Sequence, residues 1–341
     1  MATSHQRTEK TDVTVISDPE AGRMAWRDVH ASHADASPFC DPVFLDGLER
    51  ILPWKRLFIH APGLGAASVF VRRRGPVKDL VLPPFCPYSA VHPEEGVGSE
   101  ATSRSLLLST PNLPPTRLFS LEPGLDESIL GPAPEQGHTV TRRFTYHLST
   151  APIEDAVAAW SSSQRRSFRR HVATYRYQRV DAQDLTRASD TVRQDLKQVA
   201  ALTAGGYDRH GSRLPLSRAG LLQLSEELMR HERGTLHLLR SSKSGSIEAG
   251  VLTLGRAGMA WYWLAGSLPG PAMTVLMGHV QDDLHHAGVP VLDLMGANTA
   301  GIGEFKRRFG GALVSYLHVR TATRAGVMAE RAAQWIHRFR K

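Results

Sequence analysis

The pattern of apolar and polar positions is most regular between residues 235 and 319. Apolar runs rich in β-branched and aromatic residues alternate there with turn-forming segments at 243–245 and 256–258, which is typical of antiparallel strands. A longer segment with helical periodicity follows, and after it two more apolar runs. The pattern predicts three strands, a helix, a strand, a short helix and a strand, at residues 235–240, 247–254, 259–265, 271–287, 289–294, 304–309 and 313–319.

The segments on either side of this region also have helical periodicity. Residues 153–175 predict one helix, and the three consecutive serines at 161–163 favour a break within it. Further helices are predicted at residues 194–205, 217–230 and 323–340, the last of which is basic.

The first 150 residues contain shorter and less regular elements. Asp41 followed by Pro42 predicts the start of a helix, whereas residues 83–89 contain three prolines and predict a fixed loop. Apolar runs predict strands at 56–60, 67–71, 79–82, 118–121 and 144–148, with a turn of helix at 103–108. We therefore expect a disordered or loosely attached tail at 1–22 and two units, at 23–150 and 151–341.

The composition fits a folded protein that does not span a membrane. Of the 341 residues, 41% are apolar, which supports real cores, and no run of about 18 apolar residues is present. The polar N-terminus lacks the apolar core of a signal peptide. Cys40 and Cys86 have no metal-ligand or CxxC spacing, so we expect reduced thiols in a cytoplasmic protein.

The charge is unevenly distributed between the two halves. Residues 151–341 hold 26 lysines and arginines against 16 acidic residues, whereas residues 1–150 hold 15 against 17. Part of this excess lies on one predicted helix face, which carries Arg165, Arg166, Arg169 and Arg170. Such a face either contacts water alone or binds the phosphates of a nucleic acid, and the lack of interleaved carboxylates favours phosphate binding.

The segment 289–311 combines features that suit the binding of a phosphate or an oxyanion. A buried strand is followed by a glycine-rich loop at 296–303, in which a residue such as Gly301 lets the backbone approach a ligand. The short helix after it would place Phe305 and Phe309 on one apolar face and would end at a glycine pair, 310–311. Lys306, Arg307 and Arg308 would occupy the other sides of this turn.

The predicted order of elements is that of a GCN5-related N-acetyltransferase (GNAT) domain, and three stretches make the resemblance narrower. These are Trp160 with Arg165, Arg169 and Arg170; the run 261–266; and Gly-Ile-Gly-Glu-Phe-Lys-Arg-Arg-Phe-Gly at 301–310. Together they resemble the Fem family of GNAT-like transferases, which includes aminoacyl-tRNA-dependent peptidoglycan enzymes and relatives in antibiotic biosynthesis. The resemblance is clearest over residues 151–320. It implies an α+β fold with two tandem GNAT-type units, of which the first is degenerate.

The resemblance implies transfer of an aminoacyl or acyl group from a carrier to an amine, with formation of an amide. Phe305 and Lys306 match the family's cleft residues, and Lys306 would stabilise the charge on the donor ester as it is attacked. The alternatives are that Lys306 is a surface lysine and that Phe305 only packs. Arg307 and Arg308 would join the four arginines listed above in binding tRNA.

Other candidate residues are suggested more weakly. Tyr262 lies on the strand face opposite two tryptophans and either faces the cleft or packs in the core. Asp293 would orient the acceptor amine or make a structural hydrogen bond, and Tyr88 would point into the cleft or pack. With Gly301, these are the predicted substrate-binding residues. His279, His285 and His286 have no usual ligand spacing, so no metal site is predicted.

Three functions remain open from the sequence. The first is an aminoacyl-tRNA-dependent transferase with an amine acceptor and no other cofactor. The acceptor would be a peptidoglycan precursor or, since no coiled-coil arm is predicted, a small natural product. The second is an acyl-CoA N-acyltransferase, although residues 269–273 lack the glycine-rich phosphate loop that precedes the corresponding GNAT helix. The third is a non-catalytic RNA-binding protein.

Overall fold

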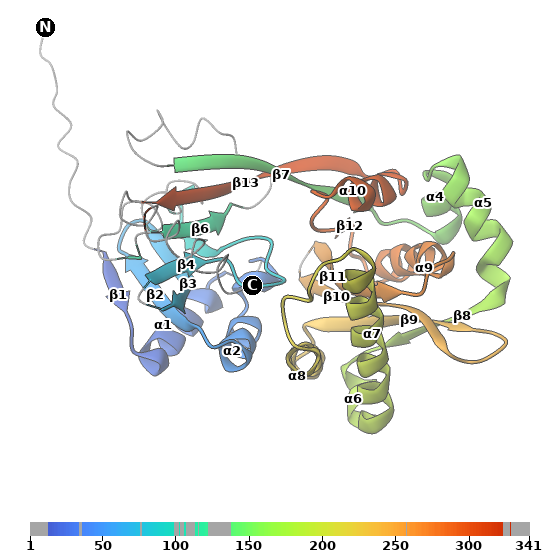
Figure 1. Cartoon of the computed structure of the whole chain (residues 1–341), viewed down its shortest axis with the longest axis horizontal. Coiled ribbons are helices and arrows are strands. Elements are labelled where there is room, and N and C mark those ends of the chain that lie inside the picture. Colours follow the sequence, from blue (N-terminus) through green and yellow to red (C-terminus); the bar gives the residue numbers. More distant parts are fainter. Residues whose placement is uncertain are drawn as a thin grey trace, which may run out of the picture.

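The computed structural model describes residues 13–322, except 34–35, 76, 99–101, 103–105, 107–112, 115, 122–137 and 257, together with residue 328. Two groups of elements stand side by side, and two long strands run across both (Figure 1). We call the first group, from β1 to β6 with α1 and α2, the N-terminal lobe. The second group, from α4 to α10, is the C-terminal lobe. The predicted helix at 323–340, except residue 328, and most of the predicted turn at 103–108 lie outside the described residues.

The N-terminal lobe is a small sheet covered on one face by two helices. Its elements are β1 (Thr14–Ile16), α1 (Pro19–Ala31), the 3₁₀ turn η1 (Pro38–Cys40), α2 (Pro42–Ile51), β2 (Lys55–Ala61), β3 (Gly65–Arg74), β4 (Val77–Val81), β5 (Ala90–Pro93) and β6 (Thr116–Ser120). Side chains from the other face of the sheet, among them Ile59 and Phe119, form a separate core with Leu317 of the last described strand.

The predicted tail at 1–22 is too long, because β1 and the first turn of α1 lie inside it. Asp18 accepts a hydrogen bond from the Ala21 N–H, and Pro19 occupies the first helical position. Asp41 and Pro42 begin α2 in the same way, as predicted. The Asp–Pro pair that identified the second helix therefore also identifies the first.

The C-terminal lobe is a sheet with helices on both faces. Its elements are α4 (Ile153–Ala158), α5 (Ser162–His171), a 3₁₀ turn η4 (Val172–Thr174), β8 (Tyr175–Val180), α6 (Ala182–Arg187), α7 (Ser189–Arg209), α8 (Arg218–Arg230), β9 (Gly234–Ser241), β10 (Ile247–Arg256), β11 (Met259–Ser267), α9 (Ala272–His286), β12 (Val291–Asp293) and α10 (Ala300–Arg307). Side chains of α7 and α8 cover one face of β9–β11, and those of α4, α5 and α9 cover the other.

The predicted break at 161–163 is confirmed, since α4 ends at Ala158 and α5 begins at Ser162. The end of the predicted helix is wrong. Residues Tyr175–Val180 form the edge strand β8, which pairs with β9, and its alternation of half-buried tyrosines with exposed polar residues is that of a strand. The helices α1 and α6 were also not predicted. The other strands and helices from residue 217 to 319 occur in the predicted order, with ends shifted by a few residues.

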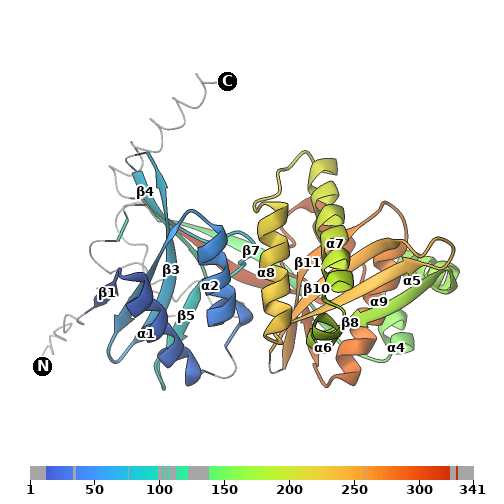
Figure 2. The ribbon, with the colours of Figure 1, turned by 90° about the horizontal axis from the view of Figure 1, so that it is seen from below.

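The two lobes share one continuous sheet. Its order is β1-β2-β3-β4-β6-β13-β7-β12-β11-β10-β9-β8, in which β7 (His138–Ser149) and β13 (Ala312–Ala322) lie at the centre. These two strands pair antiparallel along ten residues and cross from the N-terminal lobe to α10 (Figure 1). Below them α2 and α8 lie against each other (Figure 2), and one apolar core contains side chains of both lobes.

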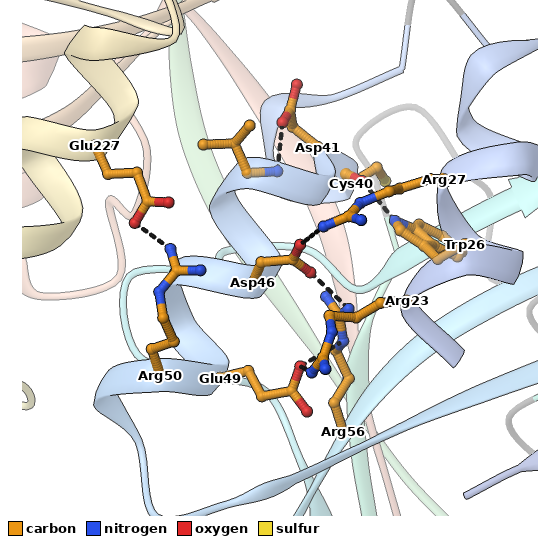
Figure 3. A network of polar contacts seen from close by, with 11 residues as sticks. Arg23, Trp26, Arg27, Cys40, Asp41, Asp46, Glu49, Arg50, Arg56 and Glu227 are labelled. Atoms are coloured by element: carbon orange, nitrogen blue, oxygen red, sulfur yellow. Dashed lines mark hydrogen bonds and ion pairs between the residues drawn. The ribbon is translucent and has the colours of Figure 1, made fainter. Parts of the chain in front are cut away.

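A charged network lies within the N-terminal lobe, between α1, α2 and β2 (Figure 3). Arg56 is buried and donates to Asp46 at 2.7 Å, and its Nε lies 3.4 Å from Glu49. Asp46 also accepts from Arg27 at 2.5 Å, and Glu49 from Arg23 at 3.2 Å. Each buried charge therefore has partners of opposite sign, which a buried ion pair requires.

Candidate active site

A cavity lies where β11 and β12 separate. The two strands pair in parallel over three residues only, ending at Trp261 and Asp293. Beyond that point the chain that follows β12 stays bonded to β7, with which β12 also pairs: Leu294 donates to the Tyr146 carbonyl and Ala297 to the Phe144 carbonyl. β11 continues to Ser267 and stays paired with β10 on its other side. The gap between the two backbones is the kind of concave site in which ligands bind.

This cavity has a volume of about 430 Å³ and is lined by side chains of both lobes. The N-terminal lobe supplies a short loop, and α7, β11, the loop after β12, α10 and β13 supply the other walls. The lining residues are Phe85, Cys86, Pro87, Thr203, Tyr207, Tyr262, Trp263, Ala265, Leu294, Met295, Gly296, Ile302, Phe305, Lys306 and Tyr316. Two of the predicted site residues, Lys306 and Phe305, therefore lie in one wall.

Lys306 is buried at the cavity wall, with 8% of its surface exposed. Its Nζ donates to the carbonyl oxygens of Leu294 and Met295 at 2.6 Å each and of Gly296 at 2.9 Å. Burial lowers the pKa of Lys306 to about 8, and the charge of Asp293 acts in the opposite direction. An ammonium group has three donors, so the three carbonyls occupy all of them, and they hold the loop 294–296 against α10.

Asp293 is fully buried and holds elements of both lobes together. Its carboxylate accepts hydrogen bonds from the Tyr88 hydroxyl at 2.9 Å, from the Met295 N–H at 2.6 Å and from the Thr145 hydroxyl. His147 Nε2 lies 3.5 Å from the same carboxylate. Asp293 and Tyr88 do not line the cavity, so of the two roles expected for Asp293 the structure displays the structural hydrogen bond.

Tyr262 lines the cavity from β11; its neighbours Trp261 and Trp263 belong to the core on the other face, and Trp263 also contributes to the cavity wall. The Lys306 Nζ lies 5.7 Å from the centre of the Tyr262 ring. The Tyr262 hydroxyl donates to the sulfur of Met273 at 3.3 Å. Phe305 packs edge-on against Phe309 at 5.0 Å, as the i, i+4 spacing predicted, and also contributes to the cavity wall.

Gly301 does not lie at the cavity. The predicted glycine-rich loop is shorter than expected, because α10 begins at Ala300 rather than Glu304, and Gly301 is exposed within that helix. Gly303 permits this early start, since a Cβ there would lie 2.8 Å from the Ala297 carbonyl oxygen. The predicted glycine cap is confirmed: Gly310 has a φ of +77° and follows the end of the helix.

The six predicted tRNA-binding arginines lie on α5 and at the C-terminal end of α10, and the residues that flank these two helix ends contact each other. The Ser161 N–H at the start of α5 donates to the Arg308 carbonyl at 2.9 Å, and Trp160 packs on Phe309 at 4.9 Å. The cluster therefore extends from α10 onto α5. Arg165 is half-buried and bonds to a backbone carbonyl, and the other five are exposed: Arg166, Arg169, Arg170, Arg307 and Arg308.

Arg307 and Arg308 differ from the other arginines of the cluster because Glu304 pairs with both, at 2.7 and 2.9 Å. No ion pair joins Arg166, Arg169 or Arg170 to any residue that the structure describes. The α5 part of the cluster thus presents uncompensated positive charge, which is the part best suited to phosphate binding.

The first turn of α9 is covered by α5. Ala272, Met273 and Thr274 are buried, the Thr274 hydroxyl donates to Gln164 of α5 at 3.0 Å, and a Cβ at Gly278 would lie 2.7 Å from the Phe168 ring. A phosphate needs free backbone N–H groups at a helix N-terminus. Here that end of the helix is packed rather than open.

Sequence reasoning did not identify two of the phenols that line the cavity. Tyr207 follows the predicted helix at 194–205, and Tyr316 lies in the middle of a predicted strand, so neither is marked by a motif. Within the described segments of the chain, no group of three or more histidine, cysteine or acidic side chains could hold a metal ion. No described helix combines the length and the apolar character needed to cross a bilayer.

Comparison with known proteins agrees with this architecture. Residues 145–307 match the family described as acetyltransferase (GNAT) domain. The chain has a GNAT-like α+β fold, as predicted, and the matched region supplies most of the cavity wall, including Lys306. No curated protein matches the chain by sequence.

Three solved structures share the fold over almost the whole chain. The C-terminal domain of a protein described as a lysylphosphatidylglycerol synthetase from Agrobacterium fabrum has a TM-score of 0.57 and 14% identity, covering 93% of this chain and 97% of that one. L-PGS from Bacillus licheniformis has a TM-score of 0.56 and 12% identity, covering 94% and 97%. FemX has a TM-score of 0.55 and 11% identity, covering 90% and 96%. At these identities the likeness concerns the fold.

Proposed function

We propose that this protein transfers an aminoacyl group from aminoacyl-tRNA to an amine acceptor and forms an amide bond. The observation that carries the proposal is the position of Lys306, whose buried cation lies at the wall of a cavity formed by both lobes. The cavity opens where two parallel strands separate, which gives an extended acyl group and an amine room to meet. The Fem-type run at 301–310 and the GNAT domain match agree with acyl transfer.

In this reaction the acceptor nitrogen attacks the carbonyl carbon of the donor ester, and negative charge develops on the carbonyl oxygen. Lys306 supports that charge through its field, since no carboxylate of the described residues contacts the ammonium and three neutral carbonyls fix it. Because the ammonium is held in place before the reaction, the protein groups around it need not reorganise when the transition state forms. The loop 294–296, pinned by the same lysine, keeps the wall of the cavity in position.

Two further observations support tRNA rather than coenzyme A as the donor's carrier. The arginines of α5 and α10 form one basic surface beside the helix that bears Lys306, and the buried first turn of α9 leaves little access for a pyrophosphate. The description of the matched family as acetyltransferase favours the acyl-CoA alternative. FemX, the lysylphosphatidylglycerol synthetase domain and L-PGS are similar folds and are compatible with either donor.

The experiment that tests the proposal compares donors. The purified protein is incubated with a mixed pool of amines and with charged total tRNA, the same tRNA after RNase treatment, or acetyl-CoA, and product amides are measured by mass spectrometry. We expect an amide that disappears after RNase treatment, with a mass shift that identifies the amino acid. Product from acetyl-CoA alone would replace the proposal with the acyl-CoA alternative.

A further inference from the structure

Tyr316 is a fixed phenol in the wall of the cavity. It lies on β13, only 6% of its surface is exposed, and its ring meets that of Tyr88 edge-on at 5.2 Å. On the neighbouring strand its partner in the register is Arg143, which is half-buried. The ring therefore has little freedom, and the position of its hydroxyl is determined by the surrounding strands.

The hydrogen bonds of Asn298 determine which way the Tyr316 hydroxyl proton points. The Asn298 side-chain oxygen accepts from the Phe144 N–H at 2.8 Å, and the adjacent Ala297 N–H donates to the Phe144 carbonyl at 2.7 Å. A backbone N–H can only donate, so the Asn298 NH₂ group must be the end that faces Tyr316, at 3.3 Å. The Tyr316 oxygen is thus an acceptor in this contact.

It follows that the proton of the Tyr316 hydroxyl is not used in the contact with Asn298. Among the described residues no acceptor for it is found, although the side chain is buried at the cavity wall. Burial raises the pKa of Tyr316, Asn298 and Arg143 lower it, and the charge of Asp293 raises it further, so the phenol is neutral at pH 7. Asn298 and Arg143 stabilise a phenolate when one forms. An occupant of the cavity can accept this proton.

We propose that Tyr316 is a catalytic residue that carries a proton from the attacking amine to the departing oxygen of the donor, with Asn298 as its positioning residue. This inference rests on the proposed function. The new N–C bond forms as the C–O bond of the ester breaks, and the departing ribose oxygen takes the Tyr316 proton. The phenolate then takes the proton that the nitrogen loses. No other reactant is needed, and the products are an amide and a hydroxyl group.

The test depends on the leaving group. Tyr316→Phe is compared with the wild-type protein on two donors of the same amino acid, aminoacyl-tRNA and a 4-nitrophenyl ester, whose nitrophenolate leaves without a proton. We expect kcat to fall by on the order of 100-fold with aminoacyl-tRNA and by less than about threefold with the nitrophenyl ester. Equal losses with both donors, or no loss with either, would overturn the role of Tyr316. Absence of amide from wild-type protein with both donors would instead refute the proposed function.

Two Asn298 variants and one tyrosine variant separate proton transfer from packing. Asn298→Asp keeps the acceptor for the Phe144 N–H, but its carboxylate accepts a hydrogen bond from the Tyr316 hydroxyl. The hydroxyl proton is then directed away from the substrate, so this variant should lose kcat with aminoacyl-tRNA and not with the nitrophenyl ester, as Tyr316→Phe does. Asn298→Ala removes the positioning donor together with the acceptor for the Phe144 N–H, and it should give a smaller loss of the same kind. Tyr207→Phe changes another phenol of the cavity and should affect both donors equally. A donor-dependent loss in Tyr207→Phe, and not in Tyr316→Phe, would reassign the proton to Tyr207.

Discussion

The two lobes hold a buried cation in opposite ways. In the N-terminal lobe Arg56 contacts two carboxylates, Asp46 and Glu49 (Figure 3), and each of these has a second arginine partner. Among the described residues, the Lys306 ammonium of the C-terminal lobe contacts neutral carbonyl oxygens, and the charge of the buried Asp293 acts on it without a direct ion pair. The first arrangement cancels the charge and the second keeps it. A cancelled charge can stabilise the fold, whereas only a retained charge can act on a substrate.

The largest effect is expected from Lys306→Met, which removes the retained charge. We expect kcat/KM for amide formation to fall by on the order of 100-fold or more, because electrostatic stabilisation of the oxyanion is lost. Circular dichroism and a denaturation curve check that the variant is folded. Lys197→Met, which changes an exposed lysine on α7, is the matched control and should retain full activity. A fully active Lys306→Met protein would show that both buried cations are structural.

The reciprocal change is Arg56→Met, which should affect stability and leave catalysis intact. Asp46 and Glu49 would lose their shared partner while remaining largely buried, and we expect the free energy of unfolding to fall by about 3 kcal/mol. The measurement is urea denaturation, with kcat/KM determined on the folded protein. Arg27→Ala removes a more exposed partner of Asp46 and should cost less than about 1 kcal/mol. A loss of kcat/KM in folded Arg56→Met protein would contradict the purely structural role that we assign to Arg56.

A pH profile tests the protonation state of Lys306. Burial lowers its pKa to about 8, so the ammonium form is present below that pH and is lost as the pH rises through it. At saturating donor we expect the rate to be about tenfold lower at pH 9 than at pH 7. Lys306→Arg keeps the charge at both pH values, so any activity it retains should not show this decline. A wild-type rate that rises steadily to pH 9 would contradict a role for the ammonium form.

The smallest effect is expected from the exposed arginines of α5 and α10, whose positive charges lie at the surface and would act on tRNA binding. Replacing Arg165, Arg166, Arg169 and Arg170 by alanine should weaken tRNA binding and reduce the slope of log K against log salt by about 3. Replacing Arg307 and Arg308 should change the slope less, since Glu304 already compensates them. Filter binding or fluorescence anisotropy across a salt series measures both. An unchanged slope in the fourfold variant would exclude the α5 face as the tRNA contact.

The sequence predicted most of what local patterns determine. The turn segments between β9, β10 and β11, and the glycine cap after α10, were recognisable because single residues control them. β8 was missed because its arginines continue the basic run of the preceding helix, which conceals the alternation of Tyr175 and Tyr177. Lys306 was recognised from its motif, but the three carbonyls that hold it belong to a loop and have no side-chain pattern.

Residues that act together across long separations could not be predicted. Asp293 bonds to Tyr88 and to Thr145, which lie 205 and 148 positions away in the chain. The direction of the Tyr316 hydroxyl proton depends on Asn298, and the orientation of the Asn298 amide is in turn determined by the backbone N–H of Phe144. Each link depends on how strands from two lobes align, so no single stretch of sequence contains the information.

The central position of β7 and β13 has a consequence for biosynthesis. β13 is the last strand of the described chain, yet it lies between β6 of the first lobe and β7, which in turn pairs with β12. While the ribosome is still making residues before 312, the edges of β6 and β7 that will receive this strand are unpaired. Exposed strand edges promote aggregation. We therefore expect the nascent chain to need chaperone protection until its last strand emerges, and neither lobe to fold to completion before the other.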